Sequence, residues 1–276
     1  MDDLPANVHE GRVLAELARR SLPNIRALLR SVYSTTLLAA VVPDFLCPMA
    51  LPIAAELGVP GYLFFPSNLA MVALTRHIVE LHDGAAPGEY RDVAVPLELP
   101  GGVSLCGADM PDAFRASFTN PRYAKLVELV RSYRLADGIL VNTFYEMELG
   151  TAEAFKRLAA PEQAAGEGFF PHAGMNAVIL EEKLGVALRV PAAREDDRCL
   201  VTRHEIATAV KELVEEGQKL RRRAESLQKA AAGAWSPEGP SRRALEEVAV
   251  KLKVALGIES GSSDMKKESH LNYSVN

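Results

Sequence analysis

Two short apolar runs on either side of a helical segment constrain the fold of this chain more than any other feature. The runs cover residues 37–42 and 61–65, and the helical segment between them covers 48–57. A short, wholly apolar run is typical of a strand covered on both faces of a parallel sheet. Gly58 at the end of the helix, with Pro60 just beyond, is typical of a helix C-terminus. The order β-α-β therefore predicts a parallel α/β sheet.

Further segments extend this unit to about residue 160. Residues 8–32 have helical spacing with a predicted kink at Pro23, and residues 123–135 are helical as well. Residues 138–141 form a third buried strand, followed by a helix over 146–158. The first half therefore predicts an incomplete doubly wound α/β domain.

The connection after the second strand carries a cap and then a long helix. Ser67 or Asn68 is the predicted N-cap. Residues 82–121 are rich in Gly, Pro and Asp, and we expect surface loops with short helices there. The predicted buried stripe of the long helix consists of Met71, Leu74, Ile78 and Leu81.

The second half is mostly helical. A helix over 176–184 ends at Gly185, a short strand is predicted over 186–190, and Thr202 with Glu205 forms a capping box. Two amphipathic helices follow, over 218–234 and 241–256. The predicted domains are a partial α/β domain over 1–160, a linker over 161–174, a helical part over 175–258 and a disordered tail over 259–276.

Composition excludes several classes of protein. A net charge of -5 argues against nucleic-acid binding, which requires clustered Lys and Arg. No apolar run reaches the roughly 20 residues of a membrane helix, and the N-terminus has no apolar signal core, so we expect a cytoplasmic protein. Three dispersed cysteines without a C-x-x-C pair predict neither a metal site nor a disulfide framework. The G-x-S-x-G, G-x-G-x-x-G and Walker motifs are absent.

Polar residues follow each predicted strand. Asp44 follows the first, Ser67 and Asn68 the second, and Asn142 the third. Ligands of open parallel sheets bind outside the carboxyl ends of the strands, so these are candidate site residues. Asp44 can orient a catalytic imidazole or cap the following helix, and spacing leaves both open. Ser67, Asn68 and Asn142 can equally serve as caps and turn residues.

The histidines add one further candidate. His77 and His82 are five residues apart and lie on different faces of a helix, which argues against a shared metal. His204 lies inside the capping box and is expected to be exposed. His172 lies at the exit of the linker, where it can face a cleft.

Five segments of the chain have a recognisable sequence. They are Gly138–Glu148 (GILVNTFYEME), Gly58–Asn68 (GVPGYLFFPSN), Leu99–Val103 (LPGGV), Met175–Leu180 (MNAVIL) and Ala187–Arg189 (ALR). These segments resemble the plant family 1 UDP-sugar glycosyltransferases, close to the branch that glucosylates hydroquinone-type phenols. Together the similar regions cover most of residues 1–256.

The resemblance implies a GT-B fold with two Rossmann-like domains. It also implies transfer of glucose from UDP-glucose, as co-substrate and without a further cofactor, to a hydroxyl of a small phenolic acceptor, with inversion. Asp44 matches the family's aspartate that holds the catalytic histidine. By resemblance Ser67, Asn68 and Asn142 lie on the acceptor side, and His172 and Asn176 on the donor side.

The chain also departs from the family pattern. The family's catalytic histidine belongs to a segment that precedes the counterpart of residue 2, and most of the donor domain belongs between the counterparts of Gly168 and Met175. His172 and Ala173 stand where the family has an acidic residue and a glutamine. Trp235, the single tryptophan, lies in the C-terminal helical region, whereas the family's signature tryptophan stacks on uracil in the donor domain. We therefore expect a truncated GT-B-like fold, an incomplete Rossmann-like domain plus a helical remnant of the second.

Three functional hypotheses follow from this pattern. The first is a glycosyltransferase-family chain that is itself inactive. The second is a non-catalytic small-molecule-binding or scaffold protein. The third is an enzyme with a relocated site, in which His172 acts with Asp44.

Overall fold

The computed structural model describes residues 10–84, 96–111, 114, 119–158, 173–190 and 201–258. His172, the predicted linker up to residue 172 and the predicted tail lie outside the described residues. The helices are α1 (Glu10–Thr35), α2 (Leu51–Leu57), α3 (Leu69–Gly84), α4 (Pro121–Ser132), α5 (Leu149–Leu158), α6 (Ala173–Val178), α7 (Arg203–Glu216), α8 (Gln218–Ala234) and α9 (Pro240–Ala255). The strands are β1 (Tyr62–Phe65), β2 (Leu97–Leu99), β3 (Val103–Leu105) and β4 (Gly138–Val141).

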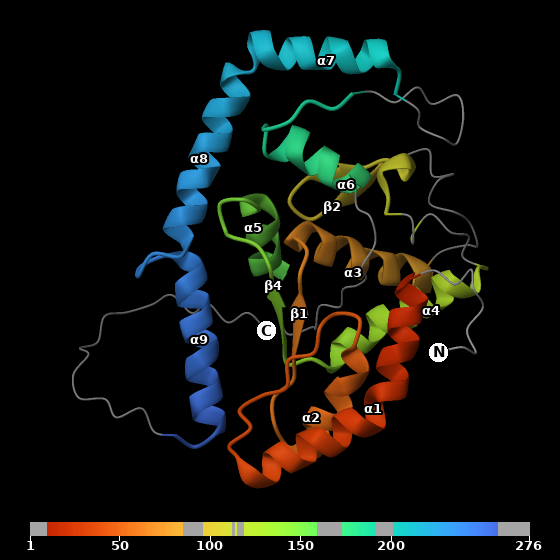
Figure 1. Cartoon of the computed structure of the whole chain (residues 1–276), viewed down its shortest axis with the longest axis vertical. Helices are drawn as coiled ribbons and strands as arrows, with labels where there is room; N and C mark the ends of the chain where they lie inside the picture. Colours follow the sequence, from red (N-terminus) through yellow and green to blue (C-terminus); the bar gives the residue numbers. More distant parts are fainter. Residues whose placement is uncertain are drawn as a thin grey trace.

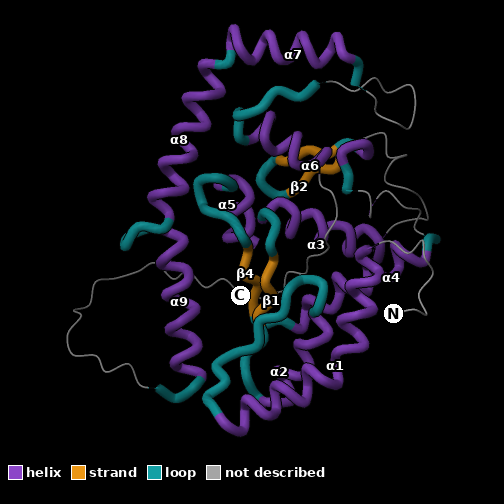
Figure 2. The backbone as a smooth tube through the Cα atoms, in the orientation of Figure 1, coloured by secondary structure: helices purple, strands orange, loops and turns teal. Residues whose placement is uncertain are grey.

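Strands β1 and β4 form the parallel pair that the sequence predicts. Tyr62 lies opposite Gly138 and Phe65 opposite Val141. Figure 1 shows the two strands side by side, and Figure 2 shows helices on either side of them. The pair therefore places the connections that follow Phe65 and Val141 at one edge.

The predicted strand over 37–42 is wrong as a regular strand. Among the described residues, two isolated parallel bridges form on this side of β1, Val41 with Gly61 and Asp44 with Phe64. Pro43 lies between them and has no N–H to donate, although its carbonyl accepts from the Phe64 N–H at 2.8 Å. The segment thus follows β1 closely without forming a continuous ladder.

Several predicted helix ends are confirmed. Gly58 ends α2 with a φ of 67°, in the left-handed region that glycine tolerates. The side-chain oxygen of Asn68 accepts from the Met71 N–H at 2.8 Å, so Asn68 caps α3. Thr202 and Glu205 form the capping box of α7. Helix α1 contains Pro23 and is bent in Figure 1.

Helix α5 begins later than predicted. It starts at Leu149 rather than at residue 146, because the residues just before it form a hydrogen-bonded turn. Within that turn the Met147 N–H donates to the Phe144 carbonyl at 3.0 Å and the Glu148 N–H to the Tyr145 carbonyl at 3.2 Å.

The prediction of surface loops between residues 82 and 121 is wrong where β2 and β3 form an antiparallel hairpin. Leu99, Val103 and Leu105 are buried in the core. Gly101 and Gly102 make the turn with φ of 89° and 75°, and a Cβ at Gly101 would lie 2.4 Å from the backbone nitrogen of Thr151. The hairpin turn packs so closely on α5 that only glycine fits at residue 101.

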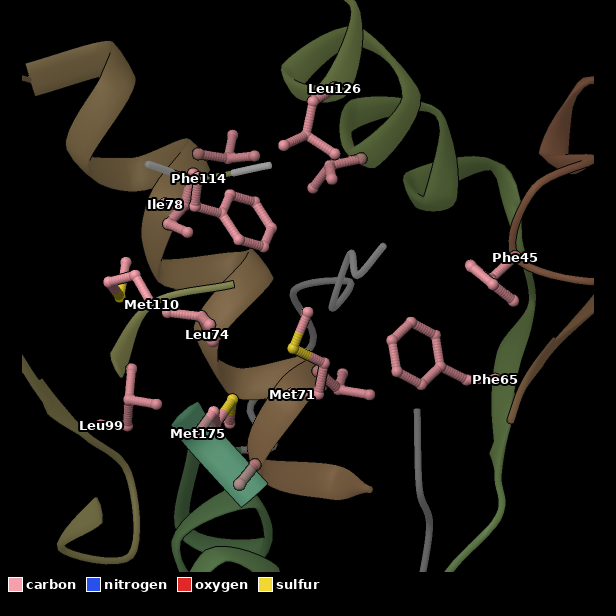
Figure 3. Close-up of a cluster of buried hydrophobic side chains, with 14 of the residues drawn as sticks. Phe45, Phe65, Met71, Leu74, Ile78, Leu99, Met110, Phe114, Leu126 and Met175 are labelled. Carbon is pink, nitrogen blue, oxygen red and sulfur yellow. The ribbon is translucent and has the colours of Figure 1, made fainter. Parts of the chain in front are cut away.

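Helix α6 and the residues that follow it up to Leu184 share the hydrophobic core of the first half. Met175, Val178, Ile179 and Leu184 belong to the same buried cluster as Met71, and Figure 3 shows Met175 within it. The segment over 186–190 is not the predicted strand. It is held by Arg189, whose backbone N–H donates to Glu181 at 3.1 Å and whose guanidinium pairs with the buried Asp109. Side-chain contacts, and no strand ladder, therefore hold this segment.

Helices α8 and α9 have the predicted bounds to within one residue, and they form the long arm in Figure 1. Arg223 of α8 donates its Nε–H to the Leu184 carbonyl at 3.1 Å, and Leu227 packs against the core. In the part of the chain that the structure describes, no helix is both long and apolar enough to cross a bilayer.

Replacing Met175 by alanine tests the packing of α6 into the core. Met175 is buried, so Met175→Ala should lower the free energy of unfolding by about 2–5 kcal/mol, from lost burial and the cavity that remains. Leu180→Ala is the matched control, because Leu180 is exposed and should cost below about 1 kcal/mol. Urea unfolding followed by circular dichroism measures both, and equal losses would show that α6 does not pack as described.

Candidate functional site

The carboxyl edge of the β1–β4 pair brings the predicted site residues together. Asp44 bridges Phe64 near the end of β1. The Asn142 N–H donates to the Phe65 carbonyl at 2.9 Å, and its side-chain amide donates to the Pro66 carbonyl at 3.2 Å. The sequence prediction that these residues lie at one edge of a parallel sheet therefore agrees with their placement.

Asp44 is exposed and closes a local turn. Its Oδ1 accepts from the Leu46 N–H at 2.8 Å, and its carbonyl accepts from the Cys47 N–H at 2.9 Å. The helical segment that follows begins with Cys47 at its N-cap, so the Asp44 carboxylate does not cap it. An ionised carboxylate has about four acceptor sites, so Asp44 keeps the capacity for a further donor.

The thiol of Cys47 lies close to this carboxylate. Burial raises the pKa of the Cys47 thiol first, and the negative charge of Asp44 raises it further. Both causes disfavour the thiolate, so Cys47 is not an activated nucleophile.

The loop that carries Asp44 rests on aromatic packing. The Phe45 and Phe65 rings meet edge to face with centroids 5.6 Å apart, and both are labelled in Figure 3. The Tyr133 hydroxyl donates to the Phe45 carbonyl at 2.6 Å. These contacts fix the backbone beside Asp44.

Asn68 and Asn176 meet across the two halves of the chain. The Asn68 side chain donates to the Asn176 side-chain oxygen at 3.5 Å, although the two residues are 108 positions apart. Asn176 is exposed on α6, and Ser67 lies half-buried in the bend between β1 and α3. The structure thus places a predicted acceptor-side residue beside a predicted donor-side residue.

Glu148 is a structural centre of the site that the sequence reasoning missed. It is buried, and its carboxylate accepts from the Leu69 and Ala70 N–H groups at 2.7 Å each and from the Thr143 hydroxyl at 2.5 Å. It therefore ties the first turn of α3 to the connection after β4. The available signal was the acidic pair of residues 146 and 148 after the strand, but spacing does not tell which carboxylate is buried.

An open cavity of about 360 Å³ lies elsewhere, between α3, β2 and α5. Arg76, His77, Glu98 and Phe155 are among its lining residues, and none of the predicted site residues lines it. Within the described ranges, no three His, Cys, Asp or Glu side chains gather in a way that would hold a metal ion.

Known proteins with similar sequences are plant glycosyltransferases. No protein-family profile matches the chain. A hydroquinone glucosyltransferase of Rauvolfia serpentina is 37% identical over 155 residues, which are 56% of this chain and 33% of that protein. UDP-glycosyltransferase 72B1 of Arabidopsis thaliana is 31% identical over 157 residues, 56% of this chain and 32% of that protein. The chain therefore matches about a third of the length of these relatives.

Two solved structures of plant glycosyltransferases show which fold this chain shares. Phytolacca americana UGT2, complexed with UDP-2fluoro-glucose and pterostilbene, superimposes with a TM-score of 0.81 at 24% identity, over 91% of this chain and 83% of that one. A Polygonum tinctorium UDP-glucosyltransferase capable of glucosylating indoxyl gives 0.80 at 21% identity, over 92% of this chain and 84% of that one. These likenesses confirm the predicted α/β, GT-B-like fold class.

Truncating Glu148 tests its part in building the site. Glu148→Ala should lower the free energy of unfolding by about 2–4 kcal/mol, because one buried N–H group, one partly buried N–H group and a hydroxyl lose a charged acceptor. Glu146→Ala is the matched control, since Glu146 is exposed and should change the free energy by no more than about 0.5 kcal/mol. Thermal unfolding compares the two variants, and a cost for Glu148→Ala equal to that of the control would contradict the assigned role.

Neutralising Asp44 tests the electrostatics beside Cys47. Asp44→Asn removes the negative charge that raises the pKa of the Cys47 thiol. The pKa should fall, so the thiolate fraction and the alkylation rate at pH 8 should rise. Peptide-resolved mass spectrometry after iodoacetamide treatment measures this, with Cys106 as internal reference. An unchanged pH profile at Cys47 would show that the carboxylate does not act on the thiol.

Proposed function

We propose that this chain, which is related in sequence and fold to the plant UDP-glycosyltransferases, takes part in transferring glucose from UDP-glucose to a hydroxyl of a small phenolic acceptor. The observation that carries the proposal is the carboxyl edge of the β1–β4 pair, where Asp44 and Asn142 follow the strand ends, together with the contact between Asn68 and Asn176. Asn68 and Asn176 come from the predicted acceptor and donor sides, and a transferase must bring its two substrates together at such a junction.

Within this proposal, Asp44 contributes to catalysis. A phenolic hydroxyl attacks the anomeric carbon of the sugar faster once a general base has removed its proton. A carboxylate orients an imidazole base by accepting a hydrogen bond from the N–H on the other side of the ring. Asp44 is exposed at the strand edge, and its backbone is fixed by the Phe45 and Tyr133 contacts. Its bond to Leu46 orients the carboxylate without exhausting its acceptor sites.

The donor side is where we expect this chain to be deficient. By resemblance His172 and Ala173 stand where the family has an acidic residue and a glutamine. An imidazole and a methyl group do not accept hydrogen bonds from sugar hydroxyls as a carboxylate and an amide do. We therefore propose that the chain by itself binds UDP-glucose weakly and is inactive or nearly so.

A non-catalytic binding or scaffold role is the alternative, and one observation favours it. Three of the predicted site side chains form hydrogen bonds to nearby backbone. Asp44 accepts from the Leu46 N–H, and Asn68 accepts from the Met71 N–H. Asn142 donates to the Pro66 carbonyl. Such contacts are sufficient to explain why these residue types occur where they do. In this alternative the edge still binds a small phenol, but nothing is transferred.

The remaining features of the proposal follow from composition and resemblance. We propose a cytoplasmic protein that uses UDP-glucose as co-substrate and needs no metal or organic cofactor. The acidic balance of the chain, with a net charge of -5, supports small-molecule partners over nucleic acid.

Thermal unfolding of the purified chain with each substrate separately tests the proposal. Millimolar hydroquinone should raise the stability, by about 2.7 kcal/mol at a hundredfold excess over its Kd, whereas UDP-glucose should raise it much less. Chromatography of the same mixtures detects any glucoside that forms.

The outcomes separate the hypotheses. If glucoside forms, its rate of formation should fall at least about a hundredfold in Asp44→Asn but not in Glu146→Gln. That result would support an active enzyme in which Asp44 contributes to catalysis. Phenol binding without product is expected of an inactive glycosyltransferase-family chain and of the binding role alike, whereas a stabilisation by UDP-glucose as large as that by hydroquinone would contradict the deficient donor side. If neither substrate shifts the transition, the proposed substrate class is wrong for this chain.

A further inference from the structure

The cavity between α3, β2 and α5 combines apolar and charged side chains and lies apart from the site proposed above. We refer to it as the α3–β2–α5 cavity. Its volume is about 360 Å³, at the lower end of the range for small-molecule pockets. Ala73, Leu99, Pro100 and Phe155 line its apolar part, and Ala73 and Leu99 are buried. A space of this size and lining fits a small, largely apolar molecule.

Helix α3 contributes two charged residues that neutralise each other. Ala73, Arg76, His77 and Glu80 are spaced three or four residues apart, so they lie on one face of the helix. The Arg76 Nε–H donates to the Glu80 carboxylate at 3.1 Å, and Nδ1 of His77 lies 3.8 Å from the same carboxylate. An anionic ligand would therefore compete with Glu80 for the Arg76 guanidinium.

Glu98 leaves the wall of the cavity with an excess negative charge. Its Oε1 accepts from the Ser104 hydroxyl at 2.5 Å across the β2–β3 hairpin, which orients the carboxylate without neutralising it. Among the described residues no cation pairs with Glu98. An ionised carboxylate has about four acceptor sites, so Glu98 can also accept from a bound donor. Because Arg76 and Glu80 balance each other, Glu98 makes the cavity favour a cation.

Phe155 supplies the aromatic surface of the cavity. Its side chain is half-buried and packs against the hydrophobic core, so the fold sets its position. An aromatic side chain contacts the ring of a ligand edge to face or by stacking, and its face attracts an ammonium group. An aromatic surface together with an unneutralised carboxylate is suited to an aromatic ring that carries an alkylammonium group.

We propose that the α3–β2–α5 cavity is a second binding site, which takes a small aromatic amine in its protonated form. The ring of the amine lies against Phe155 and Leu99, and its ammonium group donates to the Glu98 carboxylate. This binding is separate from glucose transfer, because none of the predicted site residues lines the cavity.

Titration of the full chain with three phenyl compounds of similar size tests the charge preference. 2-Phenylethylamine should bind with a Kd of about 0.1–1 mM, which is within the reach of a ligand of nine non-hydrogen atoms. The neutral 2-phenylethanol and the anionic 3-phenylpropionate should bind at least about threefold more weakly. Saturation-transfer NMR at pH 8 and low salt measures all three affinities.

Two substitutions separate the charge from the aromatic contact. Glu98→Gln keeps an acceptor for Ser104 but removes the charge, so it should raise the Kd of 2-phenylethylamine about three- to fivefold and leave that of 2-phenylethanol unchanged. Phe155→Leu keeps an apolar side chain without the ring, and it should weaken both ligands at least about threefold. Glu128→Gln is the control for charge, because Glu128 is exposed on α4 and does not line the cavity.

Circular dichroism checks that all variants remain folded. Three results would each overturn the proposal: an anion that binds as tightly as the amine, an unchanged affinity for the amine in Glu98→Gln or Phe155→Leu, or no saturable binding of 2-phenylethylamine below about 10 mM.

Discussion

The pairing of β1 with β4 is the contact on which the rest of this structure depends, because it joins strands from distant parts of the chain. At its start the Asp137 carboxylate accepts from the Gly61 N–H at 2.8 Å, and the Asp137 N–H donates to the Gly61 carbonyl at 2.7 Å. At its end Glu148 binds the first turn of α3. Both ends of the pair are thus held by carboxylates, which keeps the connections beyond Phe65 and Val141 at one edge.

That edge explains how one set of residues can serve both structure and chemistry. Asp44 closes its turn through Leu46, yet the geometry leaves the carboxylate exposed and able to accept another donor. Asn68 caps α3 with its oxygen and reaches Asn176 with its amide. A side chain whose direction is already fixed by the backbone loses less conformational entropy when a ligand binds, so structural bonds and a binding role are compatible.

The C-terminal helices show the other consequence of this architecture. Helix α6 is packed into the core of the first half, but α7 and α9 hold apolar side chains in solvent. Helix formation there is supported locally by the capping box at Thr202 and Glu205, so a helix can persist without a partner on its apolar face.

The sequence by itself determined the elements whose signals are local. Gly58, the capping box and the apolar runs at 61–65 and 138–141 predict helix ends and strands, because capping and burial patterns act over a few residues. The grouping of candidate residues at one edge followed from strand order alone. Tertiary structure decided the rest: the broken strand at Pro43, the hairpin pressed against Thr151, the three partners of Glu148 and the contact between Asn68 and Asn176, 108 residues away. Those features depend on which distant groups meet, and no local pattern encodes the partner of a buried carboxylate.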